Sequence, residues 1–538
     1  MGGRIYLTFD CCLTLRHGES IMRVCIVIFL LSLMLPAGAN AERHDDDDWP
    51  MYGRNLEHTF SNPASRINPR NVASLQPTWT FVTGDAVSAS PTVVDDVVYI
   101  GSWDGYFYAL DARSGGLRWK FGVDCQNSVV PVPSQCLAPG QTPPPRFFGD
   151  GGLITSSAAV IAGKVYFAAG KTLYSLNAKD GSLRWKRVMC GNPDQPNCAA
   201  DQKDPTRIFS SPAVFEDSIF VGWTADGVAG YRGGFAAVDS ETGRIRWRFE
   251  VDPILNGNGQ PLIVHGRVVG GRNRGCGSVW SSAAIDVDHH LVFFDTGDCK
   301  QDATTPYHEA VIALDTRTGR LRWAFRPRAS DPNHCDFDFG ASANLIDADQ
   351  GRYVGVGAKD GTYYLLNRLS SNPAGRLVWS RNVVFGGMAG GFFGAAAFNG
   401  SRLFSATGIG DGNPVTQSGL CNPSNSRDTF IQEPSMHAID VGGGGVLWQQ
   451  TMNFSFAPTT LAHDVVFAGT LGLLLPPSLN AYDARSGALL ASFKMPGSVN
   501  SGATPVGDMV FVGSGNTNDG TGSGVHAFGL HRKGPDSR

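Results

Sequence analysis

The sequence predicts an all-β protein folded as an eight-bladed β-propeller that is closed by its own N-terminal strand. Three observations support this expectation. The 538 residues include 67 Gly and 31 Pro but only 17% charged residues, a composition typical of many short strands joined by turns. One motif that ends in tryptophan recurs along the chain. The last copy of the repeat lacks one strand, and a matching strand precedes the first copy.

The N-terminus predicts an export signal rather than an element of the fold. Met22 and Arg23 precede the apolar run "VCIVIFLLSLMLP", and the small residues "AGANA" follow it. This order is typical of a secretory signal peptide cleaved before Glu42, and the run is too short for a permanent membrane span. We therefore expect residues 1–41 to be a leader and signal peptide. Residues 42–538 would form one propeller domain in the periplasm, without a membrane span. We expect the true start to be Met22, and a long natural leader is the alternative.

Eight cysteines remain after the expected cleavage, an even number that suits disulfides in an oxidising compartment. The segment between Cys276 and Cys299 has two apolar halves that fold back as a hairpin, which would place the two sulfur atoms opposite each other. We predict a disulfide between them. Two further predicted pairs are Cys125 with Cys136 and Cys190 with Cys198.

An internal repeat accounts for most of the chain. "YALDARSGGLRWKF" is followed by "YSLNAKDGSLRWKR", "AAVDSETGRIRWRF" and "IALDTRTGRLRWAF". Each copy reads as a strand, a turn closed by glycine, and a strand with tryptophan at a fixed place. A hairpin such as "SASPTVVDDVVYIGSWDGYFYALD" precedes each copy, so one unit has about four strands. The successive positions of the tryptophan are Trp119, Trp185, Trp247, Trp323, Trp379, Trp448 and, with alanine instead, Ala491.

Four-stranded units of this length cannot bury both faces alone, so we expect them to pack around an axis as blades. The last unit has no tryptophan strand, and "LQPTWTF" with Trp79 should complete it, which removes the open sheet edges. Seven blades is the alternative, because unit six contains the long insertion "GIGDGNPVTQSGLCNPSNSRDTFIQEPSM". The eight first hairpins begin near Ser88, Thr155, Ser210, Ser281, Gly340, Gly391, Ala457 and Ser501.

The repeats and the segment "DWPMYGRNLEHTFSN" resemble the quinoprotein alcohol dehydrogenases, most of all their polyvinyl alcohol dehydrogenase branch without its cytochrome c domain. The similarity covers Asp48 to Leu530. The resemblance implies pyrroloquinoline quinone as cofactor, usually with a calcium ion. No Cys-x-x-Cys-His occurs, so we expect no covalent haem, and electrons would pass to a separate acceptor such as a cytochrome c or a quinone.

The resemblance also implies particular site residues. Trp280 in "SVWSSAAID" corresponds to the aromatic floor beneath the quinone, with ordinary core packing as the alternative. Asp298 in "DTGD", eighteen residues later, corresponds to a calcium ligand. Asp226 in "VGWTADGVAGYRGG" lies near the place of a further metal ligand but is out of step by one residue.

The stretch "HCDFDFGAS" contains two acids that a strand would direct to the same face, so it requires a metal ion, a basic partner or bulk water. The resemblance implies that Asp336 is the catalytic base and touches the metal, with Asp338 as a trailing acid and Cys335 where the family has tryptophan. Lys359 in "GAKDGTYYLLNR" corresponds to the cation that stabilises the reduced quinone. The alternatives are a solvated strand end and an ordinary turn lysine.

Two functions follow from these residues. The first is a quinone-dependent dehydrogenase of small or polymeric alcohols. We favour it because a site that had lost its function would have no physical reason to retain buried acids, which are costly. The second is a non-catalytic propeller that acts as a binding or envelope-assembly scaffold, supported by the displaced Asp226 and by Cys335. The formal net charge of −4 gives no sign of nucleic-acid binding.

Overall fold

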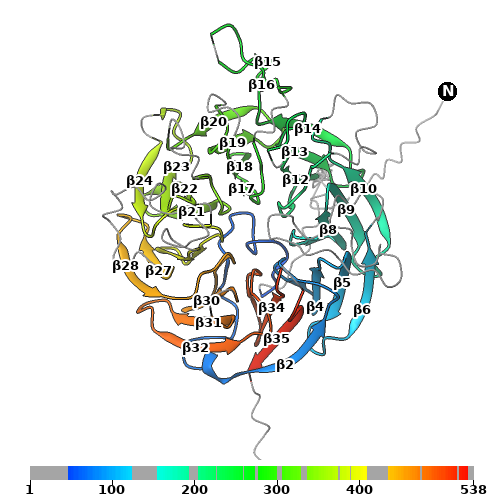
Figure 1. Ribbon diagram of the computed structural model, residues 1–538, viewed down its shortest axis with the longest axis vertical. Helices are drawn as coiled ribbons and strands as arrows, with labels where there is room; N and C mark the ends of the chain where they lie inside the picture. Colours follow the sequence, from blue (N-terminus) through cyan, green and yellow to red (C-terminus); the bar gives the residue numbers. More distant parts are fainter. Residues whose placement is uncertain are drawn as a thin grey trace, which may run out of the picture. The chain divides into compact units, whose positions relative to one another are not determined.

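Eight sheets, each with four antiparallel strands and one of them extended by a short parallel strand, form a ring of blades in the computed structural model (Figure 1). This confirms the eight-bladed propeller and excludes the seven-bladed alternative. The structure describes residues 47–123, 154–192, 204–225, 227–258, 260–272, 277–299, 306–328, 336–373, 376–387, 389–408, 434–472, 475–517 and 520–530.

In blades one to seven the four strands follow one another in the chain, and the first of them lies nearest the axis. Blades one and two comprise β3 (Thr92–Val94), β4 (Val97–Gly101), β5 (Tyr106–Asp111) and β6 (Leu117–Gly122), then β7 (Ala159–Ile161), β8 (Lys164–Ala169), β9 (Thr172–Asn177) and β10 (Leu183–Val188). Blades three and four comprise β11 (Ala213–Phe215), β12 (Ser218–Trp223), β13 (Gly234–Asp239) and β14 (Ile245–Glu250), then β17 (Ala284–Asp286), β18 (Leu291–Asp295), β19 (Val311–Asp315) and β20 (Leu321–Phe325).

The remaining blades repeat the same order. Blades five and six comprise β21 (Asn344–Ala348), β22 (Gly351–Gly357), β23 (Thr362–Asn367) and β24 (Leu377–Asn382), then β25 (Ala397–Phe398), β26 (Arg402–Ala406), β27 (Ser435–Asp440) and β28 (Val446–Thr451). Blade seven comprises β29 (Thr460–Ala462), β30 (Val465–Gly469), β31 (Ser478–Asp483) and β32 (Leu489–Lys494). The short strand β1 (Ser61–Asn62) pairs parallel with β29 and extends the sheet of blade seven. Outside the blades lie the 3-10 helix η1 (Val72–Ser74) and the hairpin of β15 (Ile263–Val264) and β16 (Arg267–Val268).

Blade eight contains strands from both ends of the chain. β33 (Thr504–Val506), β34 (Met509–Ser514) and β35 (Gly524–Leu530) are joined by β2 (Leu75–Val82), which pairs antiparallel with β35. Trp79 lies opposite Ala527 in this pair, although 448 positions of sequence separate the two residues. The N-terminal strand therefore closes the ring, as the sequence predicts.

Tryptophans of the outer strands link neighbouring blades. The indole N–H of Trp185 donates to the carbonyl oxygen of Ser240 at 3.0 Å, and its ring covers Gly243 in the turn of the next blade. Gly243 has a φ of +68°, and a Cβ there would lie 2.6 Å from the ring, so the turn requires glycine. Trp79 meets Gly115 in the same way, which links blade eight to blade one.

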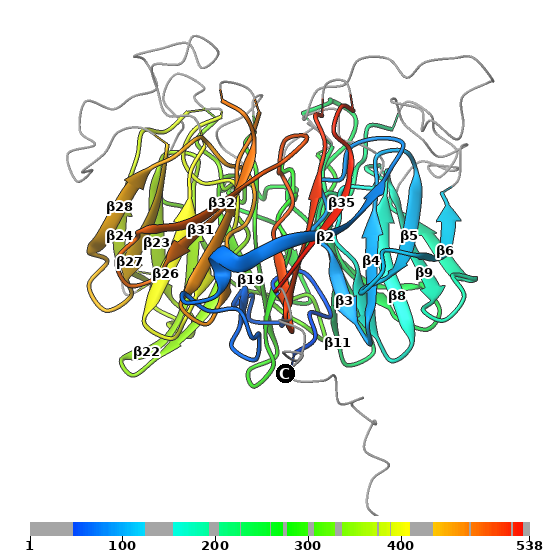
Figure 2. The same ribbon diagram turned by 90° about the horizontal axis from the view of Figure 1, so that it is seen from below.

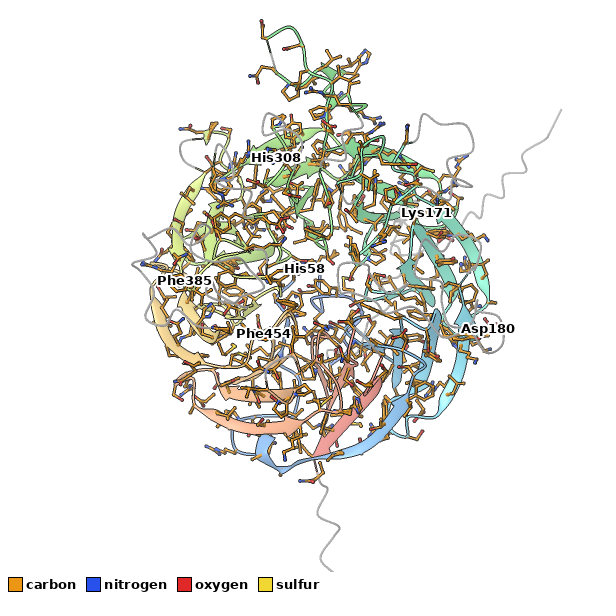
Figure 3. The ribbon with its side chains drawn as sticks, viewed as in Figure 1. His58, Lys171, Asp180, His308, Phe385 and Phe454 are labelled. Atoms are coloured by element: carbon orange, nitrogen blue, oxygen red, sulfur yellow. The ribbon has the colours of Figure 1, made fainter. Side chains whose placement is uncertain are left out.

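An N-terminal segment, residues 47–66, lies against the inner strands at one end of the axis. Figure 2 shows it in blue below the centre of the ring, and His58 lies near the middle of Figure 3. The His58 ring is buried, and its Nδ1 lies 3.0 Å from the carbonyl oxygen of Ala343. Backbone N–H groups of six inner strands donate to carbonyl oxygens of this segment, from Val93, Val160, Ile285, Leu345, Phe398 and Leu461.

The hydrophobic core consists of clusters in the seams between adjacent blades. Between blades three and four, for example, the rings of Phe235 and Phe294 stack at 4.0 Å. Among the described residues, no helix has the length and apolar character needed to cross a bilayer.

Cys190 and Cys299 are each disulfide-bonded. Their predicted partners, Cys198 and Cys276, lie outside the described residues, as do Cys125 and Cys136. The three proposed pairings therefore stay predictions, although β17 and β18 do form the expected hairpin before Cys299.

Candidate functional site

Four of the five site residues expected from the sequence meet at one end of the axis, in blades four and five. Trp280 precedes β17 and Asp298 follows β18, whereas Asp336 precedes β21 and Lys359 lies in the turn between β22 and β23. These positions all lie at strand ends, where a rigid sheet presents its loops. The fifth residue, Asp226, lies outside the described residues.

Lys359 is the centre of this group. Its ammonium lies 3.0 Å from Oδ2 of Asp336 and 2.7 Å from Oδ1 of Asp338, and the residue is only 3% exposed. Burial alone would lower the pKa of Lys359, but the carboxylates of Asp338 and Asp336 outweigh burial and raise that pKa above its usual value. Lys359 is in the predicted turn, but it is a buried cation rather than an exposed turn lysine.

The Lys359 ammonium also lies over an aromatic ring. Its Nζ is 4.8 Å from the ring centroid of Trp280 and 5.6 Å from that of Phe393. A cation in this position is attracted by the negative face of the ring. Trp280 thus belongs to the charged group at the axis and is more than a core residue.

Three carboxylates surround the lysine. Asp298, Asp336 and Asp338 each offer an oxygen atom, and the three atoms lie within 4.8 Å of one another. Burial raises the pKa of Asp338 well above its usual value; Lys359 opposes that rise, and the charges of Asp336 and Asp298 add to it. Asp338 is fully buried, so the solvated strand end is wrong for this acid. Of the partners that the two acids of "HCDFDFGAS" could have, the structure shows a basic one, Lys359.

The two acids do not lie on a strand, and here the expectation from the two-residue period is wrong. They lie in the loop before β21, and Asp336 has a φ of +59°. The backbone N–H of Lys359 donates to the carbonyl oxygen of Asp338 at 2.8 Å, which fixes the loop against the turn. This bent backbone, rather than strand alternation, brings both carboxylates to one ammonium.

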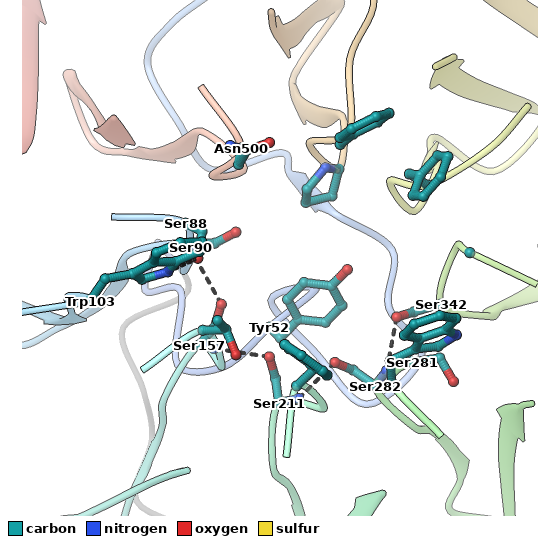
Figure 4. Close-up of a pocket in the computed structure, with 17 residues that line it drawn as sticks. Tyr52, Ser88, Ser90, Trp103, Ser157, Ser211, Ser281, Ser282, Ser342 and Asn500 are labelled. Carbon is teal, nitrogen blue, oxygen red and sulfur yellow. Dashed lines mark hydrogen bonds between the residues drawn. The ribbon is translucent and has the colours of Figure 1, made fainter. Parts of the chain in front are cut away.

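An axial cavity of about 210 Å³ adjoins this group, and Trp280 belongs to both (Figure 4). All eight blades contribute to its lining. Serine hydroxyls and the Tyr52 side chain of the N-terminal segment form much of its polar wall, and Trp103 and Phe393 supply aromatic surface. Since the inner strands run from the acidic group toward the N-terminal segment, the cavity occupies the axis between the two.

A series of blade-to-blade hydrogen bonds surrounds the cavity. Before five of the eight inner strands, a backbone N–H donates to a serine hydroxyl in the next blade, so the hydroxyl hydrogen stays available. The five bonds run from Ser90 to Ser157, Ser157 to Ser211, Ser211 to Ser282, Ser282 to Ser342, and Gly502 to Ser90, each at 2.9–3.0 Å.

The sequence alone did not identify two candidate functional residues, Asp295 and Tyr52. Asp295, the last residue of β18, is fully buried, and neither carboxyl oxygen has a hydrogen-bond partner among the described residues. Burial raises its pKa well above the usual value; Ser281 opposes the rise and the charge of Asp338 adds to it. Burial also raises the pKa of Tyr52 to about 12. A hydrogen bond with Ser342 lowers this pKa, and the charge of Asp295 raises it.

The described residues fit both groups that the resemblance implies. Carboxylate oxygens are the ligands that calcium prefers, and Asp298, Asp336 and Asp338 bring three of them within 4.8 Å of one another. Trp280 offers an aromatic face to a planar ring, and its indole N–H has no hydrogen-bond partner among the described residues.

Comparisons with known proteins show the family of the chain. A family model described as the β-propeller domain of PQQ glucose/ethanol/alcohol dehydrogenases matches residues 49–382. A polyvinylalcohol dehydrogenase of Pseudomonas sp is 25% identical over 527 residues, covering 87% of this chain and 73% of the relative. A quinohemoprotein alcohol dehydrogenase of Comamonas testosteroni is 25% identical over 380 residues, covering 66% of this chain and 49% of the relative. The chain thus spans about half the length of that quinohemoprotein.

Solved structures show the same fold. The quinohemoprotein alcohol dehydrogenase of Comamonas testosteroni has a TM-score of 0.67 at 20% identity, covering 93% of this chain and 83% of that one. A europium-containing methanol dehydrogenase has a TM-score of 0.67 at 17% identity, covering 90% and 98%. Since the family model matches more than half of the residues, this chain belongs to the PQQ glucose/ethanol/alcohol dehydrogenase propeller family.

Proposed function

We propose that the protein is a periplasmic, pyrroloquinoline quinone-dependent dehydrogenase that oxidises alcohols and passes the electrons to a separate acceptor, such as a cytochrome c or a quinone. The observation that supports this most directly is the buried Lys359 ammonium, held by Asp336 and Asp338 over the ring of Trp280. A structural ion pair has no need of an aromatic floor and a third acid beside it.

Each residue has a distinct task in the proposed reaction. Pyrroloquinoline quinone, when bound, would supply the two-electron oxidant for the alcohol. Asp336, whose side chain is 18% exposed, takes the hydroxyl proton of the alcohol, and the neighbouring ammonium orients its carboxylate. Lys359 would supply positive charge that stabilises the reduced cofactor. Trp280 would offer its aromatic ring to the planar cofactor.

A calcium ion is the proposed metal. Asp298, Asp336 and Asp338 would hold it through their carboxylate oxygens, and Asp226 would join them if its loop reaches the group. The Lys359 ammonium limits the excess negative charge of the acids before a metal arrives.

The proposed substrates are alcohols of the secondary or polymeric kind. This part of the proposal is supported by the polyvinylalcohol dehydrogenase relative, whose alignment covers 87% of this chain. Loops at strand ends form the entrance to the site, and such loops set substrate range on a fixed scaffold.

A titration of the chain that begins at Glu42 tests the proposal. Pyrroloquinoline quinone should quench tryptophan fluorescence saturably and more strongly with calcium, and the protein should reduce an artificial dye when an alcohol is added. Asp336→Asn should lower kcat by a factor on the order of 10²–10⁴ and keep quinone binding, since only the base is lost. Asp298→Ala should weaken the calcium dependence.

The matched control is Asp180→Asn, which changes an exposed turn acid at the rim of the ring (Figure 3) and should leave both readouts unchanged. Full activity in Asp336→Asn would exclude this residue as the base. Absence of quinone binding with and without calcium would favour the scaffold function instead.

A further inference from the structure

One position of the repeat departs from all its equivalents. In each blade, the first residue of the inner strand pairs with a residue of the second strand. The residue two places further along the second strand occupies the position in question, and it lies toward the axial end of the sheet. Seven of the eight residues at this position are glycine or alanine, and the eighth is an acid. In chain order they are Gly101, Ala168, Gly222, Asp295, Gly357, Ala406, Gly469 and Gly513.

The small residues have a packing reason. A Cβ at Gly222 would lie 2.3 Å from Val279 of the next blade, and one at Gly469 would lie 2.4 Å from Val499. Phe293, two residues before Asp295 on the same face of β18, packs with Phe339 in the seam between blades four and five. Asp295 therefore places a carboxyl group in the one seam that also contains the site acids.

The surroundings of Asp295 connect two regions. On one side, the backbone N–H of Asp298, three residues after Asp295, donates to Oδ2 of Asp338 at 3.3 Å. On the other side, the hydroxyl of Ser281, which lines the cavity, donates to the backbone carbonyl oxygen of Asp295 at 3.2 Å. The charge of Asp338 acts on Asp295, and the charge of Asp295 acts on Tyr52. Among the described residues no cation is paired with Asp295, and its carboxyl oxygens lack hydrogen-bond partners. A buried acid of this kind is costly, and seven blades show that the fold does without it.

The cavity next to Tyr52 can hold the water that the carboxyl group needs. A cavity of about 210 Å³ is large enough for several water molecules. Its wall offers polar partners for such waters: the serine hydroxyls, the Tyr52 hydroxyl and the Asn500 amide. Water bridges between these groups would span distances that no direct hydrogen bond covers.

We propose that Asp295 transfers protons between the acidic group at Lys359 and the hydrated axial cavity. The inference rests on the proposed dehydrogenase function. Oxidation of an alcohol to a carbonyl removes two electrons and two protons, the electrons leave to the external acceptor, and both protons must leave the buried site. Asp295 accepts a proton on one carboxyl oxygen from the site side and releases one from the other to cavity water, with no net change in its own state.

The test compares Asp295→Asn with the wild type, both loaded with quinone and calcium. Asparagine has the shape of a neutral carboxyl group, so we expect unchanged quinone quenching and an unchanged KM. We expect kcat to fall on the order of 10²-fold and the solvent deuterium isotope effect on kcat to rise, since proton release becomes limiting. Tyr52→Phe, which removes the hydroxyl at the cavity, should lower kcat less.

Infrared spectroscopy gives a readout that does not depend on turnover. Wild-type protein at pH 7 should show the carbonyl band of a protonated carboxylic acid, and Asp295→Asn should lack it. Asp104→Asn is the control, because Asp104 is a buried acid of blade one that accepts a hydrogen bond from Tyr108 at 2.6 Å. That control should keep both the band and the isotope effect.

The outcomes separate the two proposals. An active wild type with an equally active Asp295→Asn, or a variant that loses quinone affinity in proportion to kcat, overturns the proton-transfer role alone. A wild type that neither binds quinone nor oxidises alcohols overturns the proposed function and this inference together.

Discussion

At the scale of single residues, the site depends on charges that are stable only as a set. Lys359 is buried with two carboxylates within 3.0 Å of its ammonium, and Asp338 has no exposure to solvent. Each of these charges alone would face a desolvation penalty of several kcal/mol, which the partners offset. The same group can therefore serve catalysis and stabilise the seam between blades four and five.

Lys359→Met should destabilise the protein, because it leaves the buried carboxyl groups without their cation. We expect a loss of about 3–5 kcal/mol in the free energy of unfolding, read as a lower midpoint of thermal denaturation at pH 7. Adding Asp338→Asn to Lys359→Met should restore part of this loss. An unchanged midpoint in the single variant would show that the ion pairs contribute nothing to stability.

The sequence predicted the site residues that stand in a recognisable motif and missed those that do not. Asp336, Lys359 and Trp280 were each found through a local pattern, and the structure brings them together. Asp295 could have been found only with the strand register, since it is unusual only beside the glycines opposite it in other blades. Tyr52 is far from the site in sequence, and no local signal places it at the cavity.

At the scale of elements, the repeat is held together by the contact of a tryptophan with the glycine of the next blade. The sequence predicted the tryptophans, their strands and the glycine turns, because period and composition are local properties. Blade four departs from the pattern: the guanidinium of Arg376 covers Trp323 at 4.1 Å, and the indole N–H donates to the carbonyl oxygen of Arg368. The sequence between β23 and β24 is longer than the corresponding sequence in the other copies of the repeat, and no repeat pattern predicts this contact of Arg376.

Gly243→Ala should destabilise the protein more than Gly163→Ala does. Both glycines have a φ of +68°, so both changes add the backbone cost of about 1–2 kcal/mol. Only at Gly243 would the new Cβ meet a ring, that of Trp185 at 2.6 Å, which should add about 1–3 kcal/mol, whereas Gly163 faces open space. Chemical denaturation of the two variants measures the difference, and equal losses would mean that the contact is not tight.

At the scale of the whole molecule, closure joins the two ends of the repeat array. The sequence predicted that "LQPTWTF" completes the last blade, because the last copy of the repeat lacks its tryptophan strand and a strand of this type precedes the first copy. It did not predict the path of residues 47–66, since their hydrogen bonds go to inner strands throughout the chain and follow no period. Such long-range pairing is a property of the assembled ring rather than of any segment.

A chain that begins at Thr83 should lack both β2 and the N-terminal segment and should not remain monomeric. β35 would become an open edge, and the inner strands would lose six carbonyl partners, so we expect association through the exposed strand. Size-exclusion chromatography with light scattering measures the outcome. A chain that begins at Asp47 is the control and should be monomeric, and a monomeric chain from Thr83 would show that the ring closes without these strands.

The crossing of the axis by residues 47–66 also determines the order of folding. This segment is synthesised before any of the blades, but its partners in blades one to seven extend to Leu461, and β2 pairs with strand residues up to Leu530. Contacts of such high sequence separation form late, since loop closure must precede them. A part of the chain that is made before the blades is thus the last to be placed, and its docking marks the completion of the ring. Until that moment each nascent molecule presents an unpaired strand edge. The yield of folded protein therefore depends on how long each molecule is prevented from associating with other incompletely folded molecules.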